Sequence, residues 1–374
     1  MSAVVTPQHS STDLDHLVAE ICLALQISPT QFELARQHYE AVGDWLSRAG
    51  SPLQRLSPRI YPQGGMAIRT TVKPRGREEY DLDIVLEVDP VDADPMALYE
   101  DVAERLEEND VYRPRLERMK RCLRLRYEHQ FHLDILPARK DLLRGSTCIE
   151  VPDTKLECWK PSNPLGYIVW FERRCKGEAL LDAIREQAPL LPVLIEQQLQ
   201  VLRQAVQLMK RRRDNAFQGA DTAPRSIVLT TLAARHYAGS ESLTAALEQI
   251  LIAIETDVRL AAPSPIEVRN PTNPDETFSE SWSDPNHYRA FVKFIGDFRR
   301  EISELRAAEG LDEIGQRLDR MFGDSLGQRA LVAYGGRLGD AKASGNLRFA
   351  APAIIVGGRE GRQSPPHTFH HGGR

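Results

Sequence analysis

The sequence predicts an α+β protein, with strands concentrated in the first half of the chain and helices dominating the second. Between residues 80 and 88 apolar and polar residues alternate, as they do in a half-buried strand. Two further strand-like runs follow at 122–127 and 131–136, and beyond Pro152 the apolar spacing becomes mainly helical. Strands and helices that are segregated along the chain are typical of α+β folds.

Composition bounds the class of protein. The chain has 374 residues, of which 41% are apolar and 27% are charged, which is enough for about two globular domains. The net charge of −5 argues against a partner that is a long nucleic acid, because such proteins usually present an extended basic surface. A small anionic ligand is compatible with local basic stretches.

Cysteine usage and hydropathy indicate the compartment. The five cysteines include no C-x-x-C pair, a pattern that favours reduced thiols over a disulfide framework or a zinc site. No basic segment followed by an apolar one opens the sequence, and no run of about 18 apolar residues occurs. We therefore expect a cytoplasmic protein without a membrane span.

The first 65 residues predict two helices and a short extended segment. Residues 1–11 are expected to be a flexible N-terminus, followed by a helix that Ser11 or Thr12 can cap. Ser28-Pro29 interrupts it, and a second helix is expected from about Pro29 to Ala49. Residues 59–65 then read as an extended piece that ends in a glycine pair.

The next segment supplies the strands of the predicted core. Residues 80–88 form one strand, residues 95–110 a helix, and residues 122–127 and 131–136 two strands joined by a tight turn, which can pair as a hairpin. We assign residues 12–160 to this core together with the N-terminal helices.

The remainder is predicted to be a helical lobe, residues 161–334, followed by a mostly disordered tail, residues 335–374, that is rich in Gly, Ser, Pro and His. Residues 259–284 are expected to form a long loop. The expected helices cover residues 164–175, 192–213, 225–238, 242–257, 285–308 and 311–334.

Three aspartates carry the functional prediction. Asp81 and Asp83 lie two residues apart on a predicted strand, so both point to one face with about 6.6 Å between their Cα atoms. Asp134 takes a similar place on a later strand, between Leu133 and Ile135. Carboxylates on adjacent strands can hold two divalent ions about 3.5–4 Å apart, and Mg²⁺ prefers such oxygen ligands. The alternative is a solvated strand face, but Asp is disfavoured in strands, so three such placements need a reason.

A glycine pair precedes the aspartates. Gly64 and Gly65 follow Gln63 and can let backbone N–H groups approach phosphate oxygens closely. A lone Gly-Gly is more often an ordinary turn. Its place in the same predicted unit as Asp81 favours a phosphate-binding role.

These residues resemble a known family. The segments QGGMAIRTTVKP, DLDIVL and FHLDILPA are similar to the GS motif, the paired-acid motif and the third acid of polymerase-β-like nucleotidyltransferases. The closer resemblance is to the bacterial cGAS/DncV-like nucleotidyltransferases (CD-NTases), which make cyclic oligonucleotide signals in antiphage (CBASS) systems. It extends over roughly residues 12–330, and four further segments carry it: NPLGYIVWFERR, LMKRRRDNAF, PRSIVLTTLAARHY and NPTNPDETFSESW.

The resemblance implies a fold and residue roles. The fold is a mixed sheet braced by a long N-terminal helix, with a helical C-terminal lobe that closes a nucleotide cleft. Asp81, Asp83 and Asp134 would be the catalytic and metal-binding residues. The nucleotide would be bound by Gln63, Gly64, Gly65, Lys210 and Ser226.

Three of these assignments have plain alternatives or a departure from the family. Lys210 lies in a KRRR run, which is usually a solvated face, and Ser226 follows Pro224-Arg225 and can be a helix cap. Gly65 stands where the family usually has Ser, so a hydroxyl contact to phosphate is missing, for which Thr70 or Thr71 is a candidate replacement.

The activity that the resemblance implies is synthesis of a cyclic di- or trinucleotide from ATP or other nucleoside triphosphates, with Mg²⁺ or Mn²⁺ and release of pyrophosphate. The Arg-rich stretch 113–126 is either a wall for the acceptor nucleotide or a solvated strand face. The tail SPPHTFHHGGR resembles the flexible C-termini that ubiquitin-transfer-like partners conjugate, except that Arg374 follows the last glycine.

Two rival functions stay open at this point. One is a linear nucleotidyltransferase that extends RNA ends or transfers AMP to a protein. The other is an inactive module that binds nucleotides or a partner, which the Gly65 departure favours and the three intact aspartates oppose.

Overall fold

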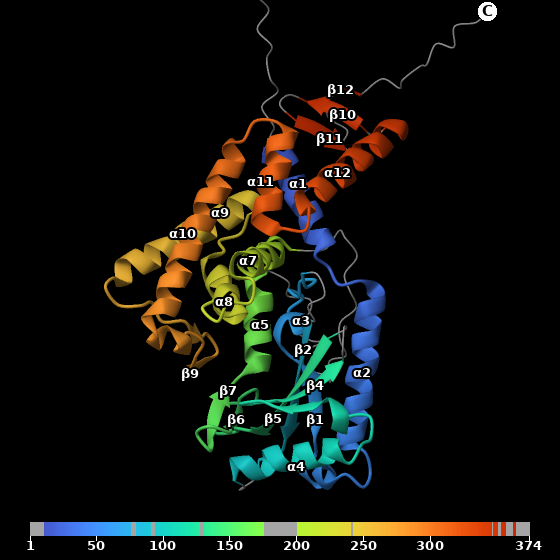
Figure 1. The fold of residues 1–374 in the computed structure, drawn as a ribbon, viewed down its shortest axis with the longest axis vertical. Helices are drawn as coiled ribbons and strands as arrows, with labels where there is room; N and C mark the ends of the chain where they lie inside the picture. The colour runs from blue at the N-terminus through green and yellow to red at the C-terminus, as the bar shows by residue number, and fades with distance from the viewer. Residues whose placement is uncertain are drawn as a thin grey trace, which may run out of the picture.

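A computed structural model describes residues 11–75, 80–90, 94–127, 131–175, 200–240, 242–345, 347–350, 353–356 and 362–363. A mixed sheet with helices on one side forms one lobe, and a bundle of helices forms the other (Figure 1). The strand and helix segregation predicted from the sequence is confirmed.

The N-terminal helical region consists of two helices. Helix α1 spans Ser11–Ala24 and packs against the helical lobe, whereas α2 spans Pro29–Ser47 and packs against the sheet lobe. A capping box starts α2: the Ser28 hydroxyl accepts from the backbone N–H of Gln31, and the Gln31 side chain accepts from the backbone N–H of Ser28. The break predicted at Ser28-Pro29 therefore separates α1, which packs against the helical lobe, from α2, which packs against the sheet lobe.

Seven strands form the main sheet. The order β1-β2-β5-β4-β3 runs along it, β6 continues from β5, and β7 pairs with β6. Strands β2 and β5 are parallel, and β4 pairs antiparallel with β5, which confirms the predicted hairpin. The bounds are β1 Arg59–Pro62, β2 Tyr80–Val88, β3 Leu116–Arg118, β4 Leu123–Tyr127, β5 Phe131–Lys140, β6 Ile149–Asp153 and β7 Cys158–Ser162.

One face of the sheet is buried by apolar side chains, so the polar side chains of β2 lie on the other face. Leu82, Ile84 and Leu86 are fully buried in a core that also contains residues of α2 and of α4, Pro95–Glu107. Because side chains alternate along a strand, Asp81 and Asp83 lie on the opposite face. That face is directed toward the helical lobe.

The helical lobe has its own core. Phe291, Phe298 and Phe322 are fully buried there, and burying such aromatic side chains is a major contribution to stability. Its helices are α5 Pro164–Arg174, α7 Val201–Phe217, α8 Ser226–His236, α9 Leu243–Ala261, α10 Pro285–Ala307, α11 Leu311–Phe322 and α12 Leu326–Ala343. Residues 192–199 of the helix expected at 192–213 lie outside the described residues.

Two expectations for the helical half need correction. Residues 259–284 are not one long loop, because α9 continues to Ala261 and a hairpin of β8, Arg269–Asn270, and β9, Asn273–Thr277, follows. The helix expected at 311–334 is two helices, α11 and α12. Gly323, with φ of 71°, ends α11 in a conformation that favours glycine.

The disordered tail expected from residue 335 also needs correction. Helix α12 continues through the Gly-rich segment to Ala343, and β10 Leu347–Ala350, β11 Ala353–Val356 and β12 Arg362–Gln363 form a small sheet. Packing against α1 overrides the poor helix propensity of glycine, and Tyr334 donates a buried hydrogen bond to Asp13 at 2.8 Å. The last eleven residues, 364–374, lie outside the described residues.

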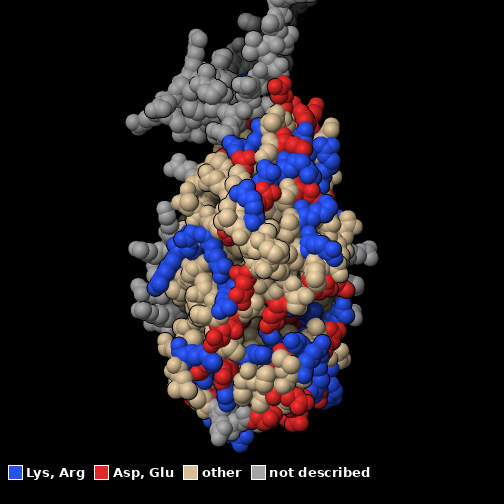
Figure 2. All heavy atoms as spheres, turned by 90° about the vertical axis from the view of Figure 1, so that its left-hand side faces the viewer, with Lys and Arg blue, Asp and Glu red and all other residues tan. Residues whose placement is uncertain are grey.

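Within the part of the chain that the structure describes, no helix is long and apolar enough to cross a membrane. Lys and Arg alternate with Asp and Glu over the face in Figure 2, and no broad basic field covers it.

Candidate active site

The sheet brings the three aspartates together. Parallel pairing of β2 and β5 places Asp83 directly opposite Asp134, and Asp81 opposite His132. All three side chains leave the sheet on the face that lies toward the helical lobe. The predicted convergence of carboxylates from neighbouring strands is therefore what the structure contains.

The electrostatics of this group are unfavourable in the absence of a cation. Burial, followed by the charges of Asp81 and Asp134, raises the pKa of Asp83 to about 7. Burial and the charge of Asp134 also raise the pKa of Asp81. Each carboxylate disfavours ionisation of its neighbours, which is the condition that a divalent cation relieves.

Arg124 provides part of the missing positive charge. Its Nε and Nη2 donate to the two carboxylate oxygens of Asp134 at 2.6 and 2.7 Å, and its Nη2 lies 3.7 Å from Asp81. This bidentate pair fixes the orientation of Asp134. Within the described residues, no group of three or more His, Cys, Asp and Glu side chains is arranged to hold a metal ion.

The glycine turn fits closely against the acids. Gly64 has φ of 63°, and a Cβ added there would lie 2.3 Å from Oδ2 of Asp83. The backbone N–H of Gln63 donates to the carbonyl of Asp83 at 2.8 Å, which joins the turn to β2. Only glycine allows both the left-handed backbone and this close approach. The turn continues into a single helical turn, α3, Gly64–Ala67.

Lys210 approaches the same turn from α7. Its ammonium donates to the carbonyl and hydroxyl of Thr70 at 3.0 and 2.8 Å, and it lies 3.4 Å from where a Cβ of residue 65 would be. Burial, aided by the charge of Arg213, lowers its pKa to about 8. Lys210 and Arg211 are 7% and 2% exposed, so the KRRR run is not a solvated face.

Two threonines follow the glycine turn, and their hydroxyls differ. The Thr70 hydroxyl is occupied by Lys210. The Thr71 hydroxyl is buried without a hydrogen-bond partner among the described residues, and it lies 3.1 Å from the position of a Cβ on Gly65. A serine at position 65 would direct its side chain into this place, so Thr71 is the better candidate to replace the missing hydroxyl.

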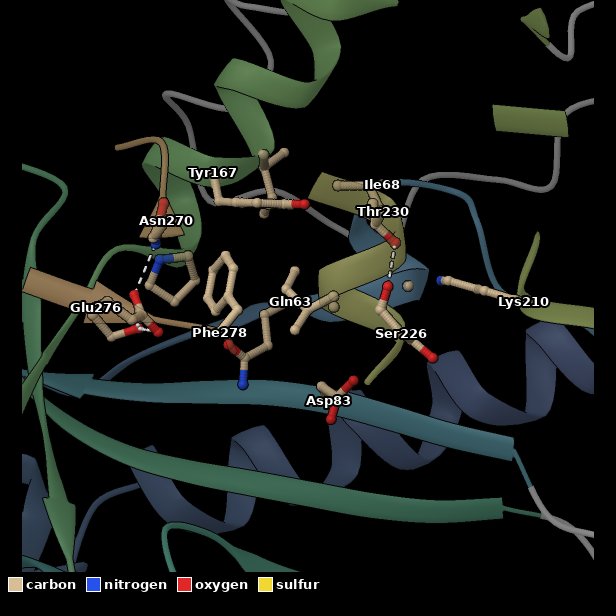
Figure 3. Close-up of a pocket in the computed structure, with 16 residues that line it drawn as sticks. Gln63, Ile68, Asp83, Tyr167, Lys210, Ser226, Thr230, Asn270, Glu276 and Phe278 are labelled. Carbon is tan, nitrogen blue, oxygen red and sulfur yellow. Dashed lines mark hydrogen bonds between the residues drawn. The ribbon is translucent and has the colours of Figure 1, made fainter. Parts of the chain in front are cut away.

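These elements enclose a cavity of about 330 Å³ between the two lobes. Lys210, Ser226 and Asp83 lie toward one end, and Asn270 and Glu276 lie toward the other, with Phe278 between them (Figure 3). Ser226 is the first residue of α8 and not its cap, because Arg225 is the N-cap residue. All five predicted nucleotide-binding residues line this cavity: Gln63, Gly64, Gly65, Lys210 and Ser226.

Sequence reasoning missed two residues. Arg124 stood within the Arg-rich stretch 113–126, whose other members Arg118 and Arg126 pair with surface acids. The signal was available, because in a β4–β5 hairpin Arg124 must share a face with Asp134. Glu276 lay in a segment expected to be a loop; the segment NPTNPDETFSESW contributed to the family resemblance, but that resemblance gave Glu276 no role.

Comparisons with known proteins identify relatives over nearly the whole chain. Residues 15–174 match the Second Messenger Oligonucleotide or Dinucleotide Synthetase domain. A c-di-GMP synthase of Roseivirga ehrenbergii is 32% identical over 370 residues, which cover 97% of this chain and 98% of that protein. The cyclic dinucleotide synthase CdnG of Bradyrhizobium diazoefficiens is 29% identical, with 91% of this chain and 90% of that protein covered.

Solved structures show the same fold. The structure of Bradyrhizobium diazoefficiens CdnG in complex with GTP superposes with a TM-score of 0.71 and 27% identity over 86% of this chain and 98% of that one. Vibrio cholerae DncV, at 16% identity, has a TM-score of 0.56 over 84% of this chain and 86% of that one, which supports the fold alone. From the extent of the similarity to the Roseivirga protein, together with the domain match, we conclude that this chain belongs to the cGAS/DncV-like nucleotidyltransferases, the CD-NTases.

Proposed function

We propose that this protein joins nucleoside triphosphates into a cyclic dinucleotide or trinucleotide in a reaction that depends on Mg²⁺ or Mn²⁺, as part of antiphage defence. The observation that carries the proposal is the convergence of Asp81, Asp83 and Asp134 on neighbouring strands, with Asp83 lining one cavity beside a glycine turn. The names of its relatives favour a cyclic product over a linear one.

The chemistry of the donor set suits a divalent cation, although among the described residues the three side chains are not arranged around one and Asp134 is paired with Arg124. Asp81, Asp83 and Asp134 offer oxygen ligands only, which hard cations prefer, and the raised pKa of Asp83 indicates that compensating positive charge is lacking. These residues would hold the ion. When bound, it neutralises phosphate charge and lowers the pKa of the attacking hydroxyl.

The remaining residues position the donor triphosphate. Lys210 is held by Thr70 through two of its three N–H donors, so the third is available to a phosphate oxygen beside Gly65. The Thr71 hydroxyl offers a second donor at the same place. Positioning and charge neutralisation account for most catalysis in phosphoryl transfer, and these contacts supply both.

Asp134 acts as an orienting and ligating group in this proposal. Two hydrogen bonds from the guanidinium of Arg124 occupy both oxygens of Asp134 and fix its orientation. Arg124 therefore holds Asp134 in place beside Asp83.

The test is incubation with radiolabelled nucleoside triphosphates and Mg²⁺, followed by phosphatase treatment and chromatography. We expect a phosphatase-resistant product from the wild type and at least a thousandfold lower rate, roughly the loss for removing the metal ligands, from Asp81→Ala/Asp83→Ala. Asp312→Ala/Asp340→Ala, which changes two exposed aspartates of α11 and α12, is the matched control and should retain full activity.

The same experiment separates the rival functions. A product that loses its terminal phosphate would favour a linear nucleotidyltransferase that acts on RNA ends or a protein. The absence of pyrophosphate release with all four triphosphates and either metal would favour an inactive nucleotide-binding module.

Conjugation of the C-terminal tail by a ubiquitin-transfer-like partner stays a prediction, because residues 364–374 lie outside the described residues. Mass spectrometry of the protein after co-expression with its neighbouring genes tests it. An unmodified Arg374 under every condition would contradict it.

A further inference from the structure

The end of the cavity away from Lys210 is built around a carboxylate. Glu276 of β9 reaches it beside Phe278, and Ser162 at the end of β7 and Asn270 of β8 complete the wall (Figure 3). Phosphate-binding groups gather at the opposite end, around Gly64, Gly65 and Lys210. A nucleotide whose phosphates lie at Lys210 would therefore direct its base toward Glu276.

Neutral groups hold Glu276 in position. The Nδ2 of Asn270 donates to Oε2 of Glu276 at 2.8 Å, and the hydroxyl of Ser162 lies 3.1 and 3.2 Å from its two oxygens. The orientation of the Asn270 amide is determined, because its Oδ1 accepts from both the backbone N–H and the hydroxyl of Thr272 at 2.9 Å. Asn270 itself is 3% exposed, so this is a rigid support.

No direct ion pair neutralises the charge of Glu276. Among the described residues no Lys, Arg or His lies within ion-pair distance of its carboxylate, although the more distant charge of Arg121 and its hydrogen-bond partners partly stabilise the ionised form. Burial raises the pKa of Glu276, and the hydrogen bonds from Asn270 and Ser162 oppose that shift. An ionised carboxylate accepts about four hydrogen bonds, so Glu276, which already accepts from Asn270, Ser162 and the backbone of Asn163, retains acceptor capacity toward the cavity.

The bases differ in what they offer to such a group. Guanine presents two adjacent donors, N1–H and the N2 amino group, which match the two oxygens of a carboxylate. Adenine and cytosine present an amino group beside a ring-nitrogen acceptor, and uracil presents one N–H between two carbonyl acceptors. Each of these three places a lone pair against a carboxylate oxygen, which is repulsive in a buried site.

We propose that Glu276 selects guanine in the donor nucleotide by accepting hydrogen bonds from N1–H and the N2 amino group. The proposal rests on the proposed function, because it assigns that cavity to the donor triphosphate. Phe278 and Tyr167 supply the apolar walls beside the base, with their rings 5.9 Å apart and nearly perpendicular.

The test measures binding, so that it does not depend on turnover. Non-hydrolysable analogues of GTP, ITP and ATP are titrated by calorimetry into the wild type, Glu276→Gln and Asp275→Asn in the presence of Mg²⁺. We expect the wild type to bind the GTP analogue on the order of a hundredfold more tightly than the ATP analogue, with the ITP analogue, which lacks the N2 amino group, between them.

Glu276→Gln should invert this preference. A glutamine amide donates one hydrogen bond and accepts one, which matches the N1 acceptor and N6 amino group of adenine. We expect weaker binding of the GTP analogue and tighter binding of the ATP analogue. Asp275 is the matched control, since it lies on the same strand, is 64% exposed and pairs with Arg144 at 3.4 Å. Asp275→Asn should leave all three affinities unchanged.

Two results would overturn the assignment of Glu276. One is a wild type that binds the GTP and ATP analogues equally, and the other is a Glu276→Gln variant that loses affinity for both by the same factor, as a structural defect would cause. Inorganic tripolyphosphate, which engages only the Lys210 end, should bind the wild type and Glu276→Gln alike. A guanine preference that depends on Glu276 in a protein that makes no cyclic product would retain this inference and contradict the proposed function alone.

Discussion

Two acids on the same sheet, Asp153 and Asp83, illustrate the difference between a structural charge and a functional one. Asp153, at the end of β6, is completely buried, and its carboxylate meets Lys120 at 3.0 Å, Arg121 at 3.2 Å and two backbone N–H groups. Burial alone would raise the pKa of Asp153, but these hydrogen bonds outweigh it and lower the pKa. Its charge stabilises the fold.

Asp83 is in the opposite situation. Its nearest charged neighbours include two other carboxylates, and its pKa is raised to about 7. Loss of solvation favours a higher pKa for both carboxyls, so it does not distinguish them. The two residues differ in whether the protein itself supplies positive charge to balance the carboxylate. Where the protein does not supply it, as at Asp83, a bound ligand is expected to do so.

The largest expected contrast is in stability. Without divalent cation at pH 8, Asp153→Asn should lower the free energy of unfolding by about 1–3 kcal/mol, because it leaves Lys120 and Arg121 without their acceptor. Asp83→Asn should raise it by about 1 kcal/mol or more, because it removes an uncompensated charge. Urea denaturation followed by circular dichroism measures both. Equal destabilisation by the two changes would show that Asp83 is a structural charge as well.

The pH dependence of stability should also have opposite signs. The pKa of Asp83 is raised from 3.8 to about 7, so this residue is better protonated in the folded state, and its effect destabilises the protein as pH rises through that window. The melting temperature of the metal-free protein should therefore fall between pH 5 and 8, and Asp83→Asn should reduce that fall. Asp153, with a lowered pKa, contributes stability that is lost on acidification, so Asp153→Asn should leave the fall above pH 5 in place.

The sequence was sufficient to predict the acid face. Alternation in β2 places Asp81 and Asp83 opposite the buried Leu82 and Ile84, and the short separation of the runs 122–127 and 131–136 predicts the hairpin that places Asp134 on the next strand. Strand periodicity is a local property, so it can be recognised without the fold. The same reasoning would have found Arg124, which is the residue of β4 directly opposite Asp134.

The other end of the cavity could not be predicted in this way. Glu276 and Asn270 form a site only because the fold brings β7 against them. Ser162 of β7, more than a hundred residues earlier in the chain, donates a hydrogen bond to Glu276. Residues 335–343 likewise read as disordered because their glycines disfavour a helix, and only contact with α1 stabilises α12. Long-range contacts of this kind leave no periodic signal in the sequence.

The smallest expected effect concerns two neighbouring hydroxyl groups, one of which is paired within the described part of the protein and one of which is not. The Thr70 hydroxyl is occupied by Lys210, whereas the buried Thr71 hydroxyl has no partner among the described residues and lies beside Gly65. If Thr71 replaces the serine that the family usually has at position 65, Thr71→Val should raise KM for the triphosphate about tenfold, the worth of one hydrogen bond to a charged group. The melting temperature should change little, because no protein contact is lost.

Steady-state kinetics with Thr71→Val, Gly65→Ser/Thr71→Val and Thr256→Val decide this point. Thr256 donates only to the carbonyl of Ile252 within α9, so Thr256→Val controls for loss of a hydroxyl elsewhere and should leave KM unchanged. In the double variant, the serine at 65 enters the space next to a valine methyl and can return a hydroxyl to the phosphate, so KM should recover toward the wild-type value. If Thr71→Val has wild-type KM, the phosphate is bound by backbone N–H groups and Lys210, and the unsatisfied hydroxyl would then be a structural defect that the fold tolerates.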